Sequence, residues 1–194
     1  MEVPFTRMPP LISSLARALY PYLQAKPYAF FGHSMGSLVS FELARYLRKK
    51  HYAGPVQLLV AAHRAPQIPW PNPPVHALPD KEFIEELHRL NGTPVEILQN
   101  AEMLEIALPM LRADFAVCET YRYVPEDPLA CPIFAGGGLD DDEISPDDLA
   151  AWHEQARSSF TLRMFPGNHF FIDSSREALL RAITRELMPF LERC

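Results

Sequence analysis

The pentapeptide Gly32-His33-Ser34-Met35-Gly36 constrains the fold more than any other stretch of the sequence. A short aromatic and apolar run that includes Phe30 and Phe31 precedes it and is typical of a buried strand. The residues after it have the apolar spacing of a helix: Val39, Leu43, Tyr46 and Leu47. Gly-x-Ser-x-Gly between a strand and a helix is the pattern of a nucleophile elbow, a sharp turn that exposes a serine hydroxyl. The pattern therefore predicts Ser34 as a nucleophile.

The two glycines and the residue after the serine have expected roles in this turn. Gly32 and Gly36 would let the strand and the helix approach each other without side chains between them. The turn would also aim the main-chain N–H of Met35 at the position where an oxyanion forms. We therefore expect Met35 to contribute one oxyanion donor.

Length and charge limit the classes of protein to consider. A chain of 194 residues is expected to form a single domain, residues 1–194, with a sizeable core. Its formal net charge is −6, and its one basic cluster is Arg48-Lys49-Lys50. Nucleic-acid binding needs a positive surface that matches the phosphates, so we expect no nucleic-acid partner.

The cysteines and the N-terminal segment bear on the location of the protein. Cys118, Cys131 and Cys194 are few, odd in number and unclustered, which favours a reducing compartment and gives no metal-ligand spacing. Residues 1–10 lack the apolar core of a signal peptide, and no apolar run is long enough to span a bilayer. The sequence therefore predicts a cytoplasmic protein without a membrane partner.

Strand and helix patterns alternate along the chain. Apolar runs predict strands at residues 27–31, 55–62, 131–135 and 160–165. Helical patterns lie between and around them, so the fold class is α/β with a mainly parallel sheet and flanking helices. Four residues are expected to begin helices by capping: Asp80, Asn100, Ser145 and Ser174. Pro21 is expected to interrupt the first helix, and Gly136-Gly137-Gly138 to end the third strand.

Position selects one of the seven histidines as the base for Ser34. His169 lies in a turn directly after a predicted strand, on the edge of the sheet where α/β folds gather their sites. His33 adjoins the nucleophile, and its side chain should point away from the hydroxyl. His63 precedes every candidate acid, whereas the expected chain order is serine, acid, histidine. His169 is therefore the predicted base.

A cluster of aspartates after the third strand supplies the candidate acid of the triad. Asp141 stands three residues after Gly138 and three before Ile144, which places its carboxylate just beyond the strand end. Asp140 and Asp142 remain alternatives. The run lacks the ligand spacing of a calcium-binding loop, so no metal is expected.

Residues 80 to about 121 depart from the alternation of strands and helices, because this segment is predicted to form helices only and is rich in Leu, Met and Phe. Two interpretations remain open: an ordinary packed core, or a helical lid over an apolar acyl pocket.

The elbow and several short segments together resemble the type II thioesterases, the stand-alone editing enzymes of nonribosomal peptide and polyketide synthases. The matching segments are 32–44, 63–66, 78–80, 90–94, 111–115, 119–121 and 166–171. The resemblance implies an α/β-hydrolase fold with Ser34, Asp141 and His169 as catalytic triad and a lid insertion at about 78–125. It also implies hydrolysis of an acyl or aminoacyl thioester on the phosphopantetheine arm of an acyl or peptidyl carrier protein, without a cofactor.

The start of the chain departs from the family pattern. Family members begin with further strands, one of which leads into a Gly-rich loop with the second oxyanion N–H. We therefore expect an N-terminally truncated fold, part of a longer product, whose elbow strand has an unpaired edge. Two other functions remain open: a carboxylesterase or lipase-like serine hydrolase, and a catalytically impaired module that binds carrier proteins.

Overall fold

The computed structural model describes residues 3–191 and divides the chain into two compact units. The sheet unit consists of Ile12–Ile68 and the described residues from Tyr123 onward. The helical unit consists of Pro69–Arg122 and the described residues up to Leu11. The expectation of one domain with an insertion at about 78–125 stays a prediction.

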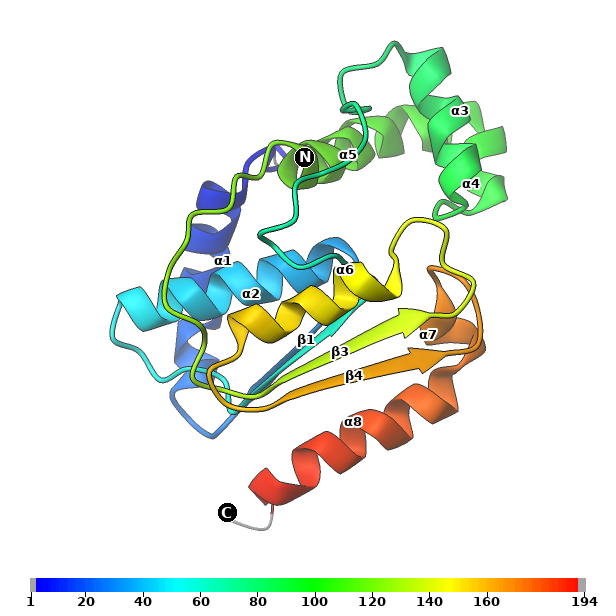
Figure 1. Ribbon diagram of the computed structural model, residues 1–194. Coiled ribbons are helices and arrows are strands. Elements are labelled where there is room, and N and C mark those ends of the chain that lie inside the picture. The colour runs from blue at the N-terminus through cyan, green and yellow to red at the C-terminus, as the bar shows by residue number, and fades with distance from the viewer. Residues whose placement is uncertain (1–2, 192–194) are drawn as a thin grey trace. The chain divides into compact units, whose positions relative to one another are not determined.

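The sheet unit contains four parallel strands in the order in which they occur in the chain (Figure 1). They are β1 (Ala29–His33), β2 (Gln57–Ala61), β3 (Ile133–Gly138) and β4 (Phe160–Phe165). In the register, Gly32 pairs with Val60 and Gly138 with Phe165. Because all four strands are parallel, their carboxyl ends lie along one edge of the sheet, and the loops that follow them meet there.

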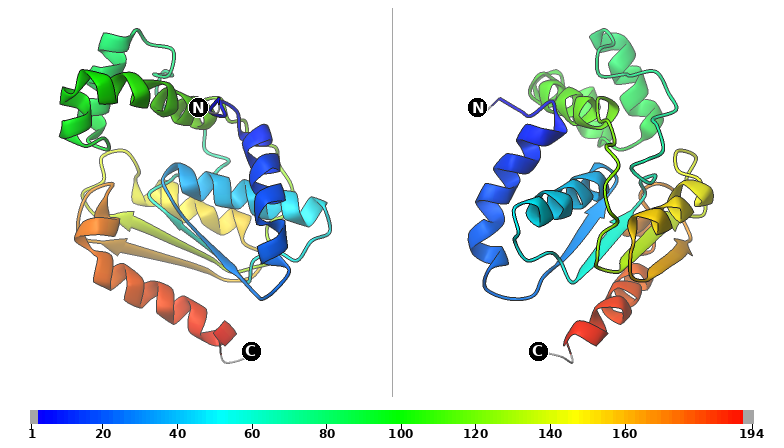
Figure 2. Two further views of the ribbon diagram at one scale, coloured as in Figure 1. Left: turned by 180° about the vertical axis from the view of Figure 1, so that it is seen from behind. Right: turned by 60° about the vertical axis from the view of Figure 1, so that its left-hand side comes forward.

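Helices cover both faces of this sheet. They are α1 (Met8–Leu23), α2 (Met35–Lys49), α6 (Pro146–Ala150), the 3₁₀ helix η1 (Ala151–Gln155), α7 (Phe171–Ser174) and α8 (Arg176–Leu191). α2 and α6 lie on one face and α8 on the other, as the views in Figures 1 and 2 agree. This arrangement is the α/β class that the alternating pattern predicted.

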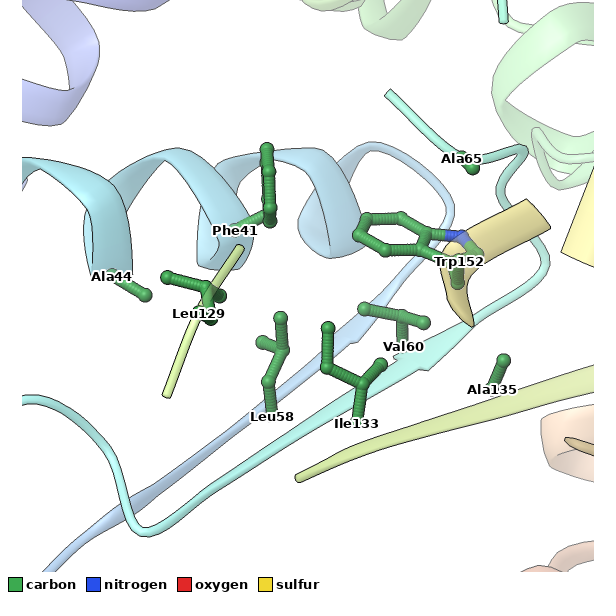
Figure 3. Packing of buried hydrophobic residues seen from close by; sticks show 9 residues of the cluster. All are labelled: Phe41, Ala44, Leu58, Val60, Ala65, Leu129, Ile133, Ala135 and Trp152. Carbon is green, nitrogen blue, oxygen red and sulfur yellow. The ribbon is translucent and has the colours of Figure 1, made fainter. Parts of the chain in front are cut away.

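Alternate residues of β2 supply the two hydrophobic cores. Leu58 and Val60 face α2 and pack in a cluster with Phe41 and Trp152 (Figure 3). The Trp152 and Phe41 rings meet edge to face with centroids 5.4 Å apart. Residues 59 and 61 of β2 face the other side and pack with Phe165 and with residues of α8. A parallel strand buried on both faces needs this continuous apolar run.

The helical unit has a core of its own. It contains α3 (Asp80–Leu90), α4 (Val95–Gln99) and α5 (Ala101–Glu119). Phe83, Leu87 and Leu98 are buried together, and Phe115 meets Phe83 edge to face at 5.5 Å between centroids. The Glu119 carboxylate accepts the main-chain N–H groups of Val75 and His76, which attaches this part of the segment before α3 to α5.

Two of the predicted helix caps are confirmed. The Asn100 side chain accepts the N–H of Met103 at 3.1 Å and begins α5. Ser145 and Asp148 form a capping box at the start of α6. Both motifs need only residues three apart in the sequence, which explains why they could be predicted locally.

Four other boundaries differ from the predictions. Asp80 is the first residue of α3 rather than its cap, and its carboxylate pairs with Arg112 at 2.7 Å. α1 continues past Pro21, which lies near its C-terminal end. α8 begins at Arg176 rather than at Ser174, which is the last residue of α7. Ser175 lies between the two helices, and its hydroxyl donates to the Pro166 carbonyl at 2.7 Å.

The fourth difference concerns β3, which runs through the glycine triplet to Gly138 instead of ending before it. A Cβ atom at Gly137 would lie 2.2 Å from Leu149 Cδ1, and one at Gly138 would lie 2.2 Å from the Asn168 carbonyl oxygen. The glycines therefore serve close packing of the strand and do not terminate it.

Three remaining expectations concern the sheet edge, the cysteines and the membrane. β1 is an edge strand of this sheet; that the chain belongs to a longer product stays a prediction. Cys118 and Cys131 are half-buried thiols, burial raises the pKa of Cys118 to about 12, and Cys194 lies outside the described residues. Within residues 3–191, no helix has both the length and the apolar character to cross a membrane.

Candidate active site

Ser34 lies at the sharp turn between β1 and α2. Its φ of 51° is in the left-handed region, which non-glycine residues rarely occupy. A Cβ atom at Gly32 would lie 2.1 Å from the Gly36 carbonyl oxygen, so only glycine fits there. The expectation for Gly36 was wrong on steric grounds, since a Cβ at that position meets no described atom within 4 Å.

Buried hydrogen bonds hold this turn against β2. The main-chain N–H of Ser34 donates to the Ala61 carbonyl at 2.8 Å. The Ser37 hydroxyl is fully buried, lies 2.9 Å from the carbonyl oxygens of Gly32 and Ala61, and accepts the Ala61 N–H at 3.0 Å. The sequence around Ser37 does not predict this role, because its neighbours do not reveal that carbonyls of two strands lie beside its hydroxyl.

The structure brings Ser34, His169 and Asp141 into one chain of hydrogen bonds. His169 Nε2 lies 3.1 Å from Ser34 Oγ, and His169 Nδ1 lies 3.0 Å from Asp141 Oδ2. An ionised carboxylate only accepts, so Nδ1 carries the hydrogen and Nε2 is left to accept the serine proton. The three residues follow β1, β3 and β4. The parallel sheet thus gathers groups 135 residues apart in sequence.

Hydrogen bonds fix the position of the Asp141 carboxylate and favour its ionised form. Its side chain is 1% exposed, and its second oxygen, Oδ1, accepts the main-chain N–H groups of Glu143 at 2.9 Å and Ile144 at 3.2 Å. Burial by itself would raise the pKa of Asp141. The hydrogen bonds from His169 and from the two amides outweigh burial and lower that pKa below its usual value. Asp140 and Asp142, the alternatives from the sequence, are exposed.

Met35 is the first residue of α2. Amide groups in the first turn of a helix have no acceptor within the helix, and the helix dipole favours negative charge there. The position therefore suits the stabilisation of an anion formed at Ser34.

The segment after β2 supports the loop that carries Asp141. Arg64 Nη2 donates to the Glu143 carbonyl at 3.0 Å, and the Ala65 N–H donates to the Asp148 carbonyl at 3.0 Å. Trp152 Nε1 donates to the His63 carbonyl at 2.8 Å. These contacts join the loop after β2 to the segment after β3. Their partners are far apart in the sequence, so residue spacing does not predict them.

His63 and His33 are both close to the site but do not bond to Ser34. His63 is buried and donates from Nδ1 to the Arg64 carbonyl at 2.7 Å; burial lowers its pKa to about 4. His33 was expected to point away from the serine hydroxyl, and its ring lies against Phe170 and Phe171. Within the described part of the chain, no three His, Cys, Asp or Glu residues gather as a metal site requires.

A parallel sheet with a serine at a strand-to-helix elbow, and with an acid and a histidine after later strands, defines the α/β-hydrolase class. Comparison with known proteins narrows this class to one family. The chain belongs to the thioesterase family, whose thioesterase-domain model matches residues 1–187. It is therefore a hydrolase of thioesters.

Individual relatives agree with this assignment. The chain is 45% identical over 186 residues to the gramicidin S biosynthesis protein GrsT of Aneurinibacillus migulanus, an alignment that covers 96% of this chain and 72% of GrsT. Among solved structures, it is similar to the RedJ thioesterase of the prodiginine pathway in Streptomyces coelicolor, with a TM-score of 0.86 and 36% identity over 95% of this chain and 69% of RedJ. The type II thioesterase BorB of the borrelidin cluster has a TM-score of 0.82 and 35% identity, over 96% and 73% of the two chains.

Proposed function

We propose that this chain is an editing thioesterase that removes acyl or aminoacyl groups from the phosphopantetheine arm of an acyl or peptidyl carrier protein. The observation that carries the chemistry is the contact chain from Ser34 through His169 to Asp141. The substrate class is supported by relatives whose names place them in gramicidin S, prodiginine and borrelidin biosynthesis. A cytoplasmic location fits a carrier-protein substrate.

The proposed reaction has two steps. Ser34 Oγ attacks the thioester carbonyl carbon while its proton moves to His169 Nε2, and the N–H of Met35 donates to the oxyanion. The carbon–sulfur bond breaks, the thiol leaves with the proton from His169, and an acyl-serine ester remains. His169 then takes a proton from water, which attacks the ester, and the acid is released as Ser34 recovers its proton.

Asp141 has a supporting role in this proposal. Ionised Asp141 keeps the hydrogen of His169 on Nδ1 and stabilises the imidazolium that forms in each step. A lid role for residues 78–125, which the family resemblance implies, stays a prediction.

Replacement of the serine tests the mechanism. We expect Ser34→Ala to lower kcat on an acyl-phosphopantetheinyl carrier protein by at least about 10³-fold, because the Ser34 hydroxyl is the group that takes up the acyl chain in the proposed mechanism. Ser40→Ala, on the same helix α2, is the matched control and should keep wild-type activity. Full activity of the Ser34→Ala protein would contradict the proposal.

Substrate comparison tests the class of ester and the partner. The wild-type protein should hydrolyse an acyl-pantetheine thioester faster than the oxygen ester of the same acid, and the carrier-bound thioester faster than the free one. Preference for the oxygen ester would favour a carboxylesterase, and carrier binding without turnover would favour an inactive binding module.

A further inference from the structure

His33 is the last residue of β1 and directly precedes Ser34. Its Nε2 atom lies 2.8 Å from the main-chain carbonyl oxygen of His169. A carbonyl oxygen only accepts hydrogen bonds, so Nε2 of His33 carries the hydrogen and donates it. The residue next to the nucleophile is therefore bonded to the main chain of the residue that faces the nucleophile.

Aromatic contacts fix the orientation of the His33 ring. Its centroid lies 5.3 Å from that of the His169 ring, 5.8 Å from Phe170 and 6.4 Å from Phe171. These three neighbours are consecutive residues of the turn after β4 and the start of α7. The ring thus packs against the same short segment whose carbonyl it bonds.

We propose that His33 is a positioning residue that holds the His169 main chain so that His169 Nε2 stays within reach of Ser34. Two adjacent residues of the elbow then contact His169 at two points. The Ser34 hydroxyl meets the ring at 3.1 Å, and the His33 ring bonds the main chain at 2.8 Å. This inference rests on the triad proposed above.

The sheet topology explains why such a tether matters. Ser34 follows β1 and His169 follows β4, and these strands form opposite edges of the four-stranded sheet. The turn after β4, which carries His169, is bonded to the loop that carries Asp141, because the Asp140 N–H donates to the Gly167 carbonyl at 2.9 Å. The His33 bond holds the same turn from the β1 side. A shift of about 1 Å between catalytic groups can cost about 10²-fold in rate, so both attachments bear on catalysis.

The surroundings keep His33 neutral while it donates. Burial lowers the pKa of His33, the bonded carbonyl raises it, and the positive charge of a protonated His169 lowers it again; Asp141 and Asp173 raise it. The net pKa lies below the ordinary value. A neutral His33 does not repel the imidazolium that forms on His169 during the reaction, so it can position that residue without opposing its protonation.

Two substitutions separate the hydrogen bond from the ring packing. His33→Phe keeps an aromatic ring against Phe170 and Phe171 but has no donor. His33→Gln loses the ring but can present an N–H group at a similar reach. Each variant is measured for kcat and KM on the carrier-bound thioester, for melting temperature, and for the rate at which a sulfonyl fluoride inactivates Ser34.

For His33→Phe, we expect kcat to fall about 10- to 100-fold with KM within about twofold of wild type, because only the alignment of His169 changes. Sulfonyl fluoride inactivation should slow by the same factor. The melting temperature should fall by no more than a few degrees, because one hydrogen bond is lost while the ring packing is kept. His33→Gln should stay within about threefold of wild type in kcat, because its N–H restores the donor.

Two results would overturn this role for His33. One is wild-type kcat and inactivation rate in His33→Phe; the other is an equal loss in the Phe and Gln variants, which would assign the effect to the ring. His169→Ala measured alongside separates this inference from the proposed function. If His169→Ala keeps activity, the triad itself is wrong; if it loses activity while His33→Phe does not, only the positioning role is wrong.

Discussion

Three consecutive aspartates follow β3, and their side chains have different surroundings. The Asp141 carboxylate is buried and accepts hydrogen bonds from the His169 ring and from two main-chain amides, whereas Asp140 and Asp142 are exposed. The spacing from Gly138 favoured Asp141 in the sequence and left Asp140 and Asp142 as alternatives. The contact with His169 required the turn after β4 to lie beside the acid loop, which spacing could not show.

We expect Asp141→Asn to lower kcat for thioester hydrolysis by about 10³- to 10⁴-fold, because an amide can donate to Nδ1 and so favours the wrong tautomer of His169. Asp140→Asn and Asp142→Asn are matched controls in the same loop and should stay close to wild type. A similar loss in Asp142→Asn, or a loss below about tenfold in Asp141→Asn, would contradict the assignment.

At the scale of elements, the packing of the elbow requires only one of the two glycines in the motif. A Cβ at Gly32 would collide with the main chain of α2, whereas one at Gly36 meets open space among the described residues. The motif contains glycine at both positions, but the packing excludes a side chain only at Gly32. Substitutions at the two positions are therefore expected to have different effects.

Gly32→Ala should abolish activity and lower the melting temperature strongly. The added Cβ would lie 2.1 Å from the Gly36 carbonyl oxygen, a main-chain atom that cannot move aside without shifting α2. Gly36→Ala should keep the melting temperature at or slightly above wild type, since alanine favours helix over glycine by up to about 1 kcal/mol. Thermal unfolding and thioester turnover of both variants check this. Equal damage in the two would mean that the steric argument fails.

Element boundaries show where local patterns sufficed. Asn100 and Ser145 begin their helices through bonds to residues three positions on, so their caps could be predicted. Asp80 pairs with Arg112 instead of capping, and Ser175 bonds to Pro166. Those partners are distant in sequence or are brought close by a turn, so the spacing of neighbouring residues does not predict them.

At the scale of the whole molecule, buried His63 links folding to pH. Its pKa falls from 6.5 to about 4, with burial as the largest cause. Between these values the unfolded chain binds a proton that the folded chain does not, so the free energy of unfolding decreases as the pH falls through this window. The contribution of His63 disappears above it, where neither state is protonated.

From about pH 7 to about pH 5, we expect His63 to account for a loss of about 2 kcal/mol in the free energy of unfolding. Denaturant unfolding at a series of pH values should therefore give a shallower pH dependence for His63→Leu than for wild type. His88→Gln, at an exposed position, is the control and should keep the wild-type slope. An unchanged slope in His63→Leu would show that His63 is not buried as a neutral group.

The sequence by itself determined the α/β class, the elbow at Ser34 and the candidate partners Asp141 and His169. These follow from local rules: apolar periodicity, a tight turn that needs Gly32, and polar residues placed just after strands. Only the tertiary structure shows the hydrogen bonds that Ser37, Arg64 and His33 make around the candidate site, and that the glycine triplet lies inside β3. Each of these depends on atoms that the parallel sheet brings together from distant positions, and no spacing along the chain encodes their contact.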